Sequence, residues 1–348
     1  MTKRPFPDTE RSVRITPQRR LSDCLPPTPI KLPSLSIEVE PPDLSPWIAG
    51  NTGIPGVHRF QSSNPGPHAA ITALMHGNEY VGAIALIELL QRGITPKCGT
   101  LSLIFLNIDA FTRFCPANPI LSRFVKEDMN RLWGDIATGS AAASPEQKRV
   151  RTLRPYIETV DCLLDLHSML WPAKPLMLAG PSKRGLALAE RIATPPLIVT
   201  DNGHKAGARL IDMPHFVRAD TPAQACLLEA GQHWSLASLD TTRKTVARFL
   251  SLQTNAQMQE QTLPKPEIAH VTHRVTARTG RFCFTRMFPS GEMIAKRGTI
   301  IATDGPDEIR TPYDNCLLVM PNFRAARHHT AVRLAQIENR EEEDSGRS

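Results

Sequence analysis

Short apolar runs that alternate with helix-like segments are the feature that most constrains how this chain folds. Each run is short enough for one strand, whereas the longer segments between the runs have helical spacing. Strands that are apolar on both faces are typical of parallel sheets covered by helices on both sides. We therefore predict an α/β fold with a mostly parallel sheet flanked by helices, its strands at residues 69–74, 101–106, 162–166 and 225–228 and its helices at 80–91, 183–192 and 241–252.

The character of the sequence changes along the chain and predicts a modular organisation. The first residues are rich in Pro, Arg, Ser and Thr, which is typical of a flexible segment. Near the other end, short β-like pieces are separated by glycines, a pattern that indicates a small all-β unit. We predict a flexible arm at 1–34, a large domain at 35–255 whose first strand is 35–40, a linker at 256–267, a small β domain at 268–338 and a disordered tail at 339–348.

The apolar and cysteine content bears on where such a chain works. No apolar run approaches the roughly 20 residues that span a bilayer. The N-terminal residues carry charge and proline where a secretory signal has an apolar stretch. The seven cysteines are widely spaced without a CxxC pair, which favours reduced thiols over disulfides or a cysteine zinc site. We therefore expect a cytoplasmic protein without a membrane partner.

The formal net charge of +7 raises the question of an anionic partner. Nucleic-acid binding is disfavoured because the arginines are scattered and aromatic residues make up only 5% of the chain. The same charge attracts a small anionic substrate. We expect such a substrate and no nucleic acid, and a homo-oligomer is left open.

His76 and Glu79 form an HxxE pair directly after a predicted strand. This spacing places both side chains on one side of a helix start or tight turn, and Gly77 leaves the backbone free to turn sharply. Imidazole nitrogen and carboxylate oxygen suit zinc, and a catalytic site needs one more protein ligand and an open position for water. His167, at the end of the strand 162–166, is the candidate third ligand. Taken alone, His76 fits a helix cap or a buried, hydrogen-bonded histidine equally well.

Two carboxylates accompany these residues at strand ends. Asp165 lies two residues before His167 and hence on the same face of the strand, where it can orient a ligand histidine; an ordinary salt bridge is the alternative. Glu229 ends the run at 225–228, and a carboxylate beside a metal-activated water can serve as general base and then as general acid. The alternative for Glu229 is a surface glutamate.

The segment RFVKEDMNRLW supplies polar side chains suited to a substrate carboxylate. Arg123 and Arg131 can form bidentate bonds to a carboxylate, which lysine does not. Asn130 adds an amide donor beside Arg131. An arginine near a metal can also polarise the scissile carbonyl. Without further context, solvated arginines in a loop would fit the same residues.

The motifs HGNE, Asn107 at a strand end, RFVKEDMNRLW, DLHS and LLEAG, in this order, resemble the succinylglutamate desuccinylase/aspartoacylase family. The resemblance covers residues 69–231 and implies a zinc carboxypeptidase-like fold. Residues 280–321 are similar to the small, barrel-like C-terminal β domain of that family.

The resemblance implies a role for each matching residue. His76, Glu79 and His167 match the ligands of one Zn²⁺ per chain, and Glu229 matches the glutamate that activates the water. Arg123, Asn130 and Arg131 match residues that bind the carboxylate and carbonyl of the substrate, with Arg131 stabilising the oxyanion. The implied reaction is hydrolysis of the linear amide of a small, carboxylate-bearing N-acyl amino acid or related N-acyl amine.

The sequence departs from the family pattern beside the expected pocket. The segment 108–122 is longer than the usual turn, Ile108 stands where a proline is usual, and the residues QHW follow the EAG of residues 229–231. The resemblance therefore leaves the acyl group and the amine open. A metallocarboxypeptidase acting on short peptides and a non-catalytic zinc-binding protein are the alternatives.

Overall fold

The computed structural model describes residues 30–134, 143–204, 206–253 and 265–338. These residues form two compact units, one of residues 35–269 and one of residues 30–34 with 270–338. The predicted boundaries of arm, domains and linker stay predictions. Most of the predicted arm, linker residues 256–264 and the predicted tail at 339–348 lie outside the described residues.

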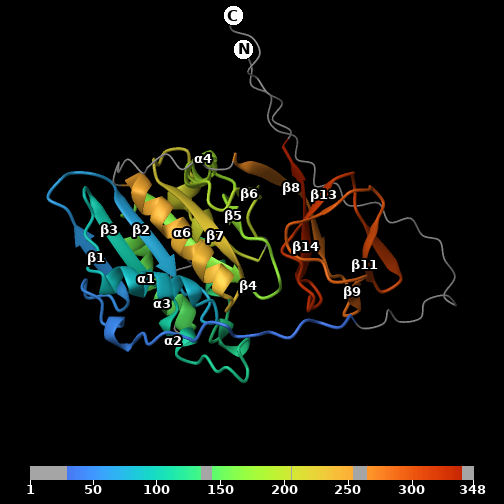
Figure 1. Cartoon of the computed structure of the whole chain (residues 1–348), viewed down its shortest axis with the longest axis horizontal. Coiled ribbons are helices and arrows are strands. Elements are labelled where there is room, and N and C mark those ends of the chain that lie inside the picture. The colour runs from blue at the N-terminus through green and yellow to red at the C-terminus, as the bar shows by residue number, and fades with distance from the viewer. Residues whose placement is uncertain (1–29, 135–142, 205, 254–264, 339–348) are drawn as a thin grey trace, which may run out of the picture. The chain divides into compact units, whose positions relative to one another are not determined.

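The larger unit is built on a sheet with the strand order β1-β3-β2-β4-β7-β5-β6 (Figure 1). The central strands β3, β2, β4 and β7 run parallel to one another. At the edges, β1 is antiparallel to β3, and β5 is antiparallel to β7 but parallel to β6. The strands are β1 (Val57–Gln61), β2 (His68–Ala73), β3 (Thr100–Phe105), β4 (Cys162–Met169), β5 (Leu176–Leu178), β6 (Leu197–Thr200) and β7 (Gln224–Gln232).

Helices and 3-10 turns connect these strands. Among the described residues they are η2 (Ser45–Trp47), α1 (Val81–Gln91), α2 (Ile108–Phe111), η3 (Leu121–Arg123), η4 (Met129–Arg131), α3 (Pro145–Ile157), α4 (Lys183–Ile192), η5 (Leu210–Asp212), α5 (Pro214–Val217) and α6 (Leu236–Gln253). The described part of the chain contains no helix with the length and apolar character needed to cross a membrane.

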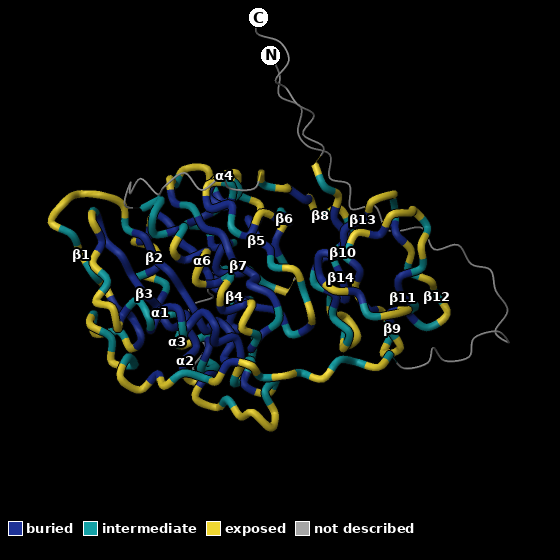
Figure 2. The backbone as a smooth tube through the Cα atoms, viewed as in Figure 1, coloured by how far each residue is buried: buried dark blue, intermediate teal, exposed yellow. Residues whose placement is uncertain are grey.

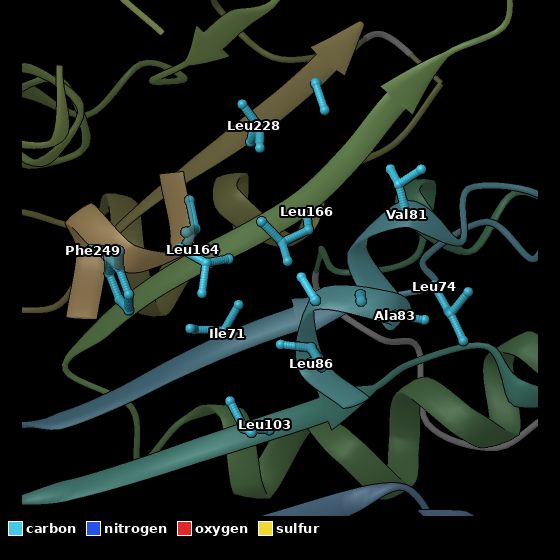
Figure 3. Packing of buried hydrophobic residues seen from close by; sticks show 14 of the residues in the cluster. Ile71, Leu74, Val81, Ala83, Leu86, Leu103, Leu164, Leu166, Leu228 and Phe249 are labelled. Atoms are coloured by element: carbon cyan, nitrogen blue, oxygen red, sulfur yellow. The ribbon is translucent and has the colours of Figure 1, made fainter. Parts of the chain in front are cut away.

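The register of the central strands gives the sheet two different faces. One face carries Ile71, Leu103, Leu164 and Leu228, which pack with Leu86 of α1 and Phe249 of α6 in the main apolar core (Figure 3). On the other face, Thr72 is in register with Asp165, and His167 with Glu229. Since side chains alternate along a strand, these polar residues all lie opposite the main core.

The predicted mostly parallel sheet flanked by helices is confirmed, with corrections in detail. Residues 35–40 do not form the predicted first strand; the N–H groups of Glu38 and Val39 both donate to the carbonyl of Trp234, at 3.0 Å each, instead of entering a strand ladder. Strands β4 and β7 extend beyond their predicted ends, so that His167 and Glu229 lie within strands rather than after them. The segment 108–122, which is longer than the usual turn of the family, begins with the short helix α2.

The smaller unit contains only strands as regular elements within its described residues. One sheet has the order β8-β14-β13-β10 and the other β12-β11-β9. Phe284, Phe288, Ile301, Leu318 and Val332 are buried in its own apolar core. Figure 2 shows buried stretches of backbone along β14. The all-β character is thus as predicted, and closure into a barrel stays a prediction. The strands are β8 (Glu267–Thr276), which begins in the larger unit, β9 (Phe282–Phe284), β10 (Glu292–Ile294), β11 (Ile300–Asp304), β12 (Asp307–Arg310), β13 (Cys316–Val319) and β14 (Thr330–Ile337).

Candidate metal centre

His76 and Glu79 lie in the tight turn that joins β2 to α1. Gly77 makes this turn possible because a Cβ at that position would lie 2.4 Å from backbone atoms of Ala110, Phe111 and Ser122. No other residue fits into that space without moving the backbone of the 108–122 segment. The glycine therefore brings the turn, and with it His76 and Glu79, directly against both ends of that segment.

The structure brings His76, Glu79 and His167 together in a buried group that can hold a metal ion; we call these three residues the ligand cluster. One nitrogen or oxygen atom from each lies within 4.8 Å of the others. Nδ1 of His76 is 2.8 Å from Oε1 of Glu79, and Nδ1 of His167 is 2.9 Å from Oε2. Each residue is about 3% exposed, so the group is shielded from competing solvent.

A carboxylate lies behind each histidine of the ligand cluster. Nε2 of His167 is 2.9 Å from Asp165, and Nε2 of His76 is 2.9 Å from Asp128. With the ring proton of His167 on Nε2 and donated to Asp165, the neutral imidazole presents the lone pair of Nδ1 toward Glu79. Nε2 of His76 lies 2.9 Å from Nη2 of Arg123 as well as from Asp128, and its Nδ1 likewise faces Glu79. Two imidazole nitrogens and one carboxylate oxygen then converge, and this donor set fits a catalytic zinc.

The charges around the ligand cluster favour a cation. Burial by itself would raise the pKa of the Glu79 carboxyl, but the two neighbouring imidazoles hold that pKa well below its usual value. Burial opposes charge on His167 as well, yet Asp165 and Glu79 raise the pKa of His167 well above its ordinary range. A field that retains a proton on a buried imidazole also attracts a metal ion, which displaces that proton on binding.

Glu229 lies beside the ligand cluster on the same face of the sheet. It is in register with His167 across the parallel pair β4 and β7, and it is 5% exposed. Burial would lower the pKa of Arg123, but Asp128, Glu79 and Glu229 together raise it. Glu229 is therefore close enough to Arg123 to interact with its charge, which puts the carboxylate at the edge of the candidate site.

The arginines predicted to bind substrate lie in a stretch without strand or α-helix, residues Arg123–Gly134, which we call the recognition segment. The guanidinium of Arg123 donates to Oε1 of Glu79 at 3.1 Å and to Asp128 at 3.2 Å. Arg131 reaches Asp128 at 3.6 Å. The side chains of Arg123 and Arg131 are 35% and 22% exposed, so both can be reached from solvent while contacting the site.

Asn130 is buried, and one atom of its side chain has a structural role. Its Oδ1 accepts a hydrogen bond from the backbone N–H of Leu210 at 2.9 Å. Arg209, next to Leu210, is 4% exposed and donates to both Asp201 and Asp212. The loop after β6 thus supports the recognition segment through the bond between Leu210 and Asn130. Nothing in the local sequence pattern indicated this contact.

Sequence reasoning missed Asp128, which contacts His76 and both arginines. Burial would raise the pKa of its carboxyl, but His76, Arg123 and Arg131 lower that pKa far below its ordinary value. Its spacing gave no signal, because the histidine that it contacts lies 52 residues away in the chain. Asp128 connects the ligand cluster to the recognition segment through both a histidine and two arginines.

His233 and Trp234 are buried close to Glu229, where packing is the expected role. Trp234 is fully buried and its Nε1 donates to the carbonyl of Asn78 at 2.9 Å. Nδ1 of His233 is 2.8 Å from the hydroxyl of Ser168. Burial, with help from nearby cations, lowers the pKa of His233 to about 4, so this imidazole is neutral at physiological pH.

Comparisons with known proteins bear on this site. The profile of the succinylglutamate desuccinylase/aspartoacylase catalytic domain matches residues 65–253, which include the ligand cluster, the recognition segment and Glu229. No curated protein sequence matches the chain.

Solved structures show the same fold at low sequence identity. Succinylglutamate desuccinylase from Vibrio parahaemolyticus is 17% identical with a TM-score of 0.64, and that from Vibrio cholerae is 17% identical with a TM-score of 0.65; each match covers 81% of this chain and 86% of the other. The product-bound ectoine utilization protein EutE (DoeB) from Ruegeria pomeroyi is 18% identical with a TM-score of 0.56, covering 81% of this chain and 88% of the other.

Proposed function

Because the chain belongs to the succinylglutamate desuccinylase/aspartoacylase family, we propose that it hydrolyses the amide bond of a small N-acyl amino acid or a related N-acyl amine. The ligands of one Zn²⁺ in this proposal are His76, Glu79 and His167. The products are a carboxylate and a free amine. The family consists of deacylases, and the choice of zinc and of this substrate class is our proposal.

One observation carries the proposal: a buried His-Glu-His group lies beside a buried glutamate and two arginines. Three protein ligands leave a coordination position open, as catalytic zinc requires. When bound there, zinc supplies Lewis acidity toward a carbonyl oxygen and lowers the pKa of a coordinated water. A structural zinc site would need a fourth protein ligand instead.

Glu229 is the proposed general base and acid. Its carboxylate is in register with His167, and low solvent access strengthens its interaction with a nearby proton. In the proposed reaction Glu229 accepts a proton from the attacking water and later donates it to the nitrogen of the departing amine. The amine therefore leaves as a neutral group rather than as an unstable amide anion.

The two arginines are proposed to have different roles. Arg123 hydrogen-bonds Glu79 directly, so its guanidinium lies nearest to the place where charge develops on the carbonyl oxygen. Arg131 reaches the ligand cluster only through Asp128, which suits it to bind the substrate carboxylate farther out. This arrangement favours Arg123 at the oxyanion, where the sequence had suggested Arg131. Asn130 holds the backbone beside them.

The test is a screen of amine release from N-acetyl and N-succinyl amino acids, against short peptides, with metal analysis of the same preparation. We expect about one zinc per chain and turnover of N-acyl amino acids, lost on chelation and restored by zinc. Protein that binds no zinc would overturn the proposal. Cleavage of peptides alone would instead identify a metallocarboxypeptidase, and zinc binding without turnover would identify a non-catalytic protein.

A further inference from the structure

The recognition segment carries Arg123 and Arg131 but belongs to no strand or α-helix. Its position therefore depends on contacts with other parts of the fold. The backbone bonds within it are short-range, such as Arg131 N–H to the carbonyl of Asp128 at 3.0 Å, and long-range backbone bonds hold it near its two ends, from Gly77 N–H to the carbonyl of Arg123 and from Trp133 N–H to the carbonyl of Ala208, at 3.2 Å each. Irregular backbone of this kind opens easily unless other parts of the fold hold it. Two side chains of α3 contact the segment, one before and one after the stretch that carries Asp128, Asn130 and Arg131.

Glu146 holds the first part of the segment. It is fully buried, and it shares one face of α3 with the buried apolar residues Val150, Leu153 and Ile157. Its carboxylate accepts the backbone N–H of Val125 at 2.6 Å and that of Lys126 at 3.3 Å. A charged carboxylate in an apolar helix face lowers stability unless it is hydrogen-bonded. The buried Glu146 carboxylate therefore depends on the two N–H groups that donate to it, and these N–H groups depend on Glu146 for an acceptor.

Arg154 holds the last part of the segment. One nitrogen of its guanidinium, Nη2, donates to the carbonyl of Trp133 at 2.6 Å and also to the carbonyl of Gly134. Arg154 lies eight residues after Glu146, which corresponds to about 12 Å along the helix axis. A single helix thus binds the segment at two separated points, and Asp128, Asn130 and Arg131 lie between them.

We propose that Glu146 and Arg154 are positioning residues, through which α3 sets the position of the recognition segment relative to the ligand cluster. Val125 lies between Arg123 and Asp128, and Trp133 lies two residues after Arg131. Displacement of either point moves a side chain that contacts the site. Misplacement by about 1 Å can lower activity about 10²-fold, so a support outside the site matters for catalysis.

The test compares Glu146→Gln, Glu146→Ala and Arg154→Met with Lys148→Gln, a change at an exposed residue of the same helix. Hydrogen exchange of the backbone amides gives a readout that needs no substrate. We expect exchange to become at least about 10-fold faster from Val125 to Arg131 in the Glu146 variants, with Ala more affected than Gln because the amide oxygen of Gln still accepts one bond. Lys148→Gln should leave the segment unchanged.

The kinetic half of the test rests on the proposed function. We expect KM for an N-acyl amino acid to rise from the wild type to Glu146→Gln and further to Glu146→Ala, with zinc content unchanged. A merely structural role would lower the active fraction, and hence kcat, at constant KM.

Unchanged exchange across residues 125–131 would overturn the inference, as would unchanged KM with an active wild type. If the wild type cleaves no N-acyl amino acid, the proposed function fails, and hydrogen exchange still decides whether α3 holds the segment.

Discussion

The ligand cluster and the recognition segment contact each other, but the fold holds them by different means. His167 lies within β4 and Glu229 within β7, so the ladder between two parallel strands sets their distance. Arg123 and Arg131 lie in 3-10 turns, whose positions depend on side chains from α3 and from the loop after β6. The comparison teaches that paired strands and one crowded turn place the ligand cluster and Glu229, whereas long-range hydrogen bonds from side chains place the two arginines.

The largest effect should follow from removing a ligand of the cluster itself. His167→Ala leaves two protein ligands, too few for stable zinc binding, and we expect metal content to fall from about one per chain to near zero. Elemental analysis of the purified variant measures this directly. His329→Ala, an exposed histidine of the small unit, is the control and should retain the metal of the wild type.

Support of the recognition segment should be tested next at Arg209. Arg209→Met leaves the buried carboxylates of Asp201 and Asp212 without their cation, and we expect a loss of about 3–5 kcal/mol in the free energy of unfolding. Urea denaturation measures this. Arg218→Met removes a pair that is more than half exposed and should cost at most about 1 kcal/mol. Equal losses in both variants would contradict the view that this loop depends on its buried ion pairs.

Glu229→Gln separates catalysis from metal binding. The variant keeps a buried, polar side chain of the same size, so we expect zinc content and unfolding free energy close to those of the wild type. It cannot accept the proton of the attacking water, and kcat should fall at least about 10²-fold. Steady-state kinetics on an N-acyl amino acid would show this, and normal turnover would remove Glu229 from the mechanism.

Asp128→Asn tests the connection between the two regions. The amide can still accept a bond from His76, but it lacks the charge that faces Arg123 and Arg131. We expect zinc affinity to weaken about 10- to 100-fold, together with a rise in KM. Competition with a chelator measures the affinity, and Glu127→Gln, which changes the neighbouring acid, is the control. Weaker zinc binding at constant KM would show that Asp128 serves the metal alone.

The regular part of the fold was accessible from sequence because its periodicity is local. The apolar runs placed the central strands to within a few residues, and the order of strands and helices predicted their parallel arrangement. His167 and Glu229 fell at the same sheet edge for that reason. The predicted strand at 35–40 was wrong because alternation alone cannot tell whether a partner strand is available to receive its N–H groups.

The rest of the candidate site depends on partners far apart in the chain. Glu146 bonds Val125 across 21 residues, and Asn130 bonds Leu210 across 80 residues. No pattern of hydrophobicity or spacing encodes such pairs, because each side chain would look equally plausible as a solvated one. Glu146 lies in the apolar stripe of α3, which is unusual for a glutamate. This is recognisable only once the buried face of the helix is known.

The crowding at Gly77 has a consequence for changing what this protein acts on. The turn of the ligand cluster touches the backbone at Ala110, Phe111 and Ser122, so the segment between β3 and the recognition segment is fixed at both of its ends. Residues 112–121 form the arc between these fixed points, and Leu121 is 78% exposed on it. Phe114 on this arc packs against Tyr80, the residue after Glu79, with ring centroids 5.0 Å apart. Loop exchange between relatives should therefore be confined to residues 115–121, where length and composition can vary without moving the ligand cluster.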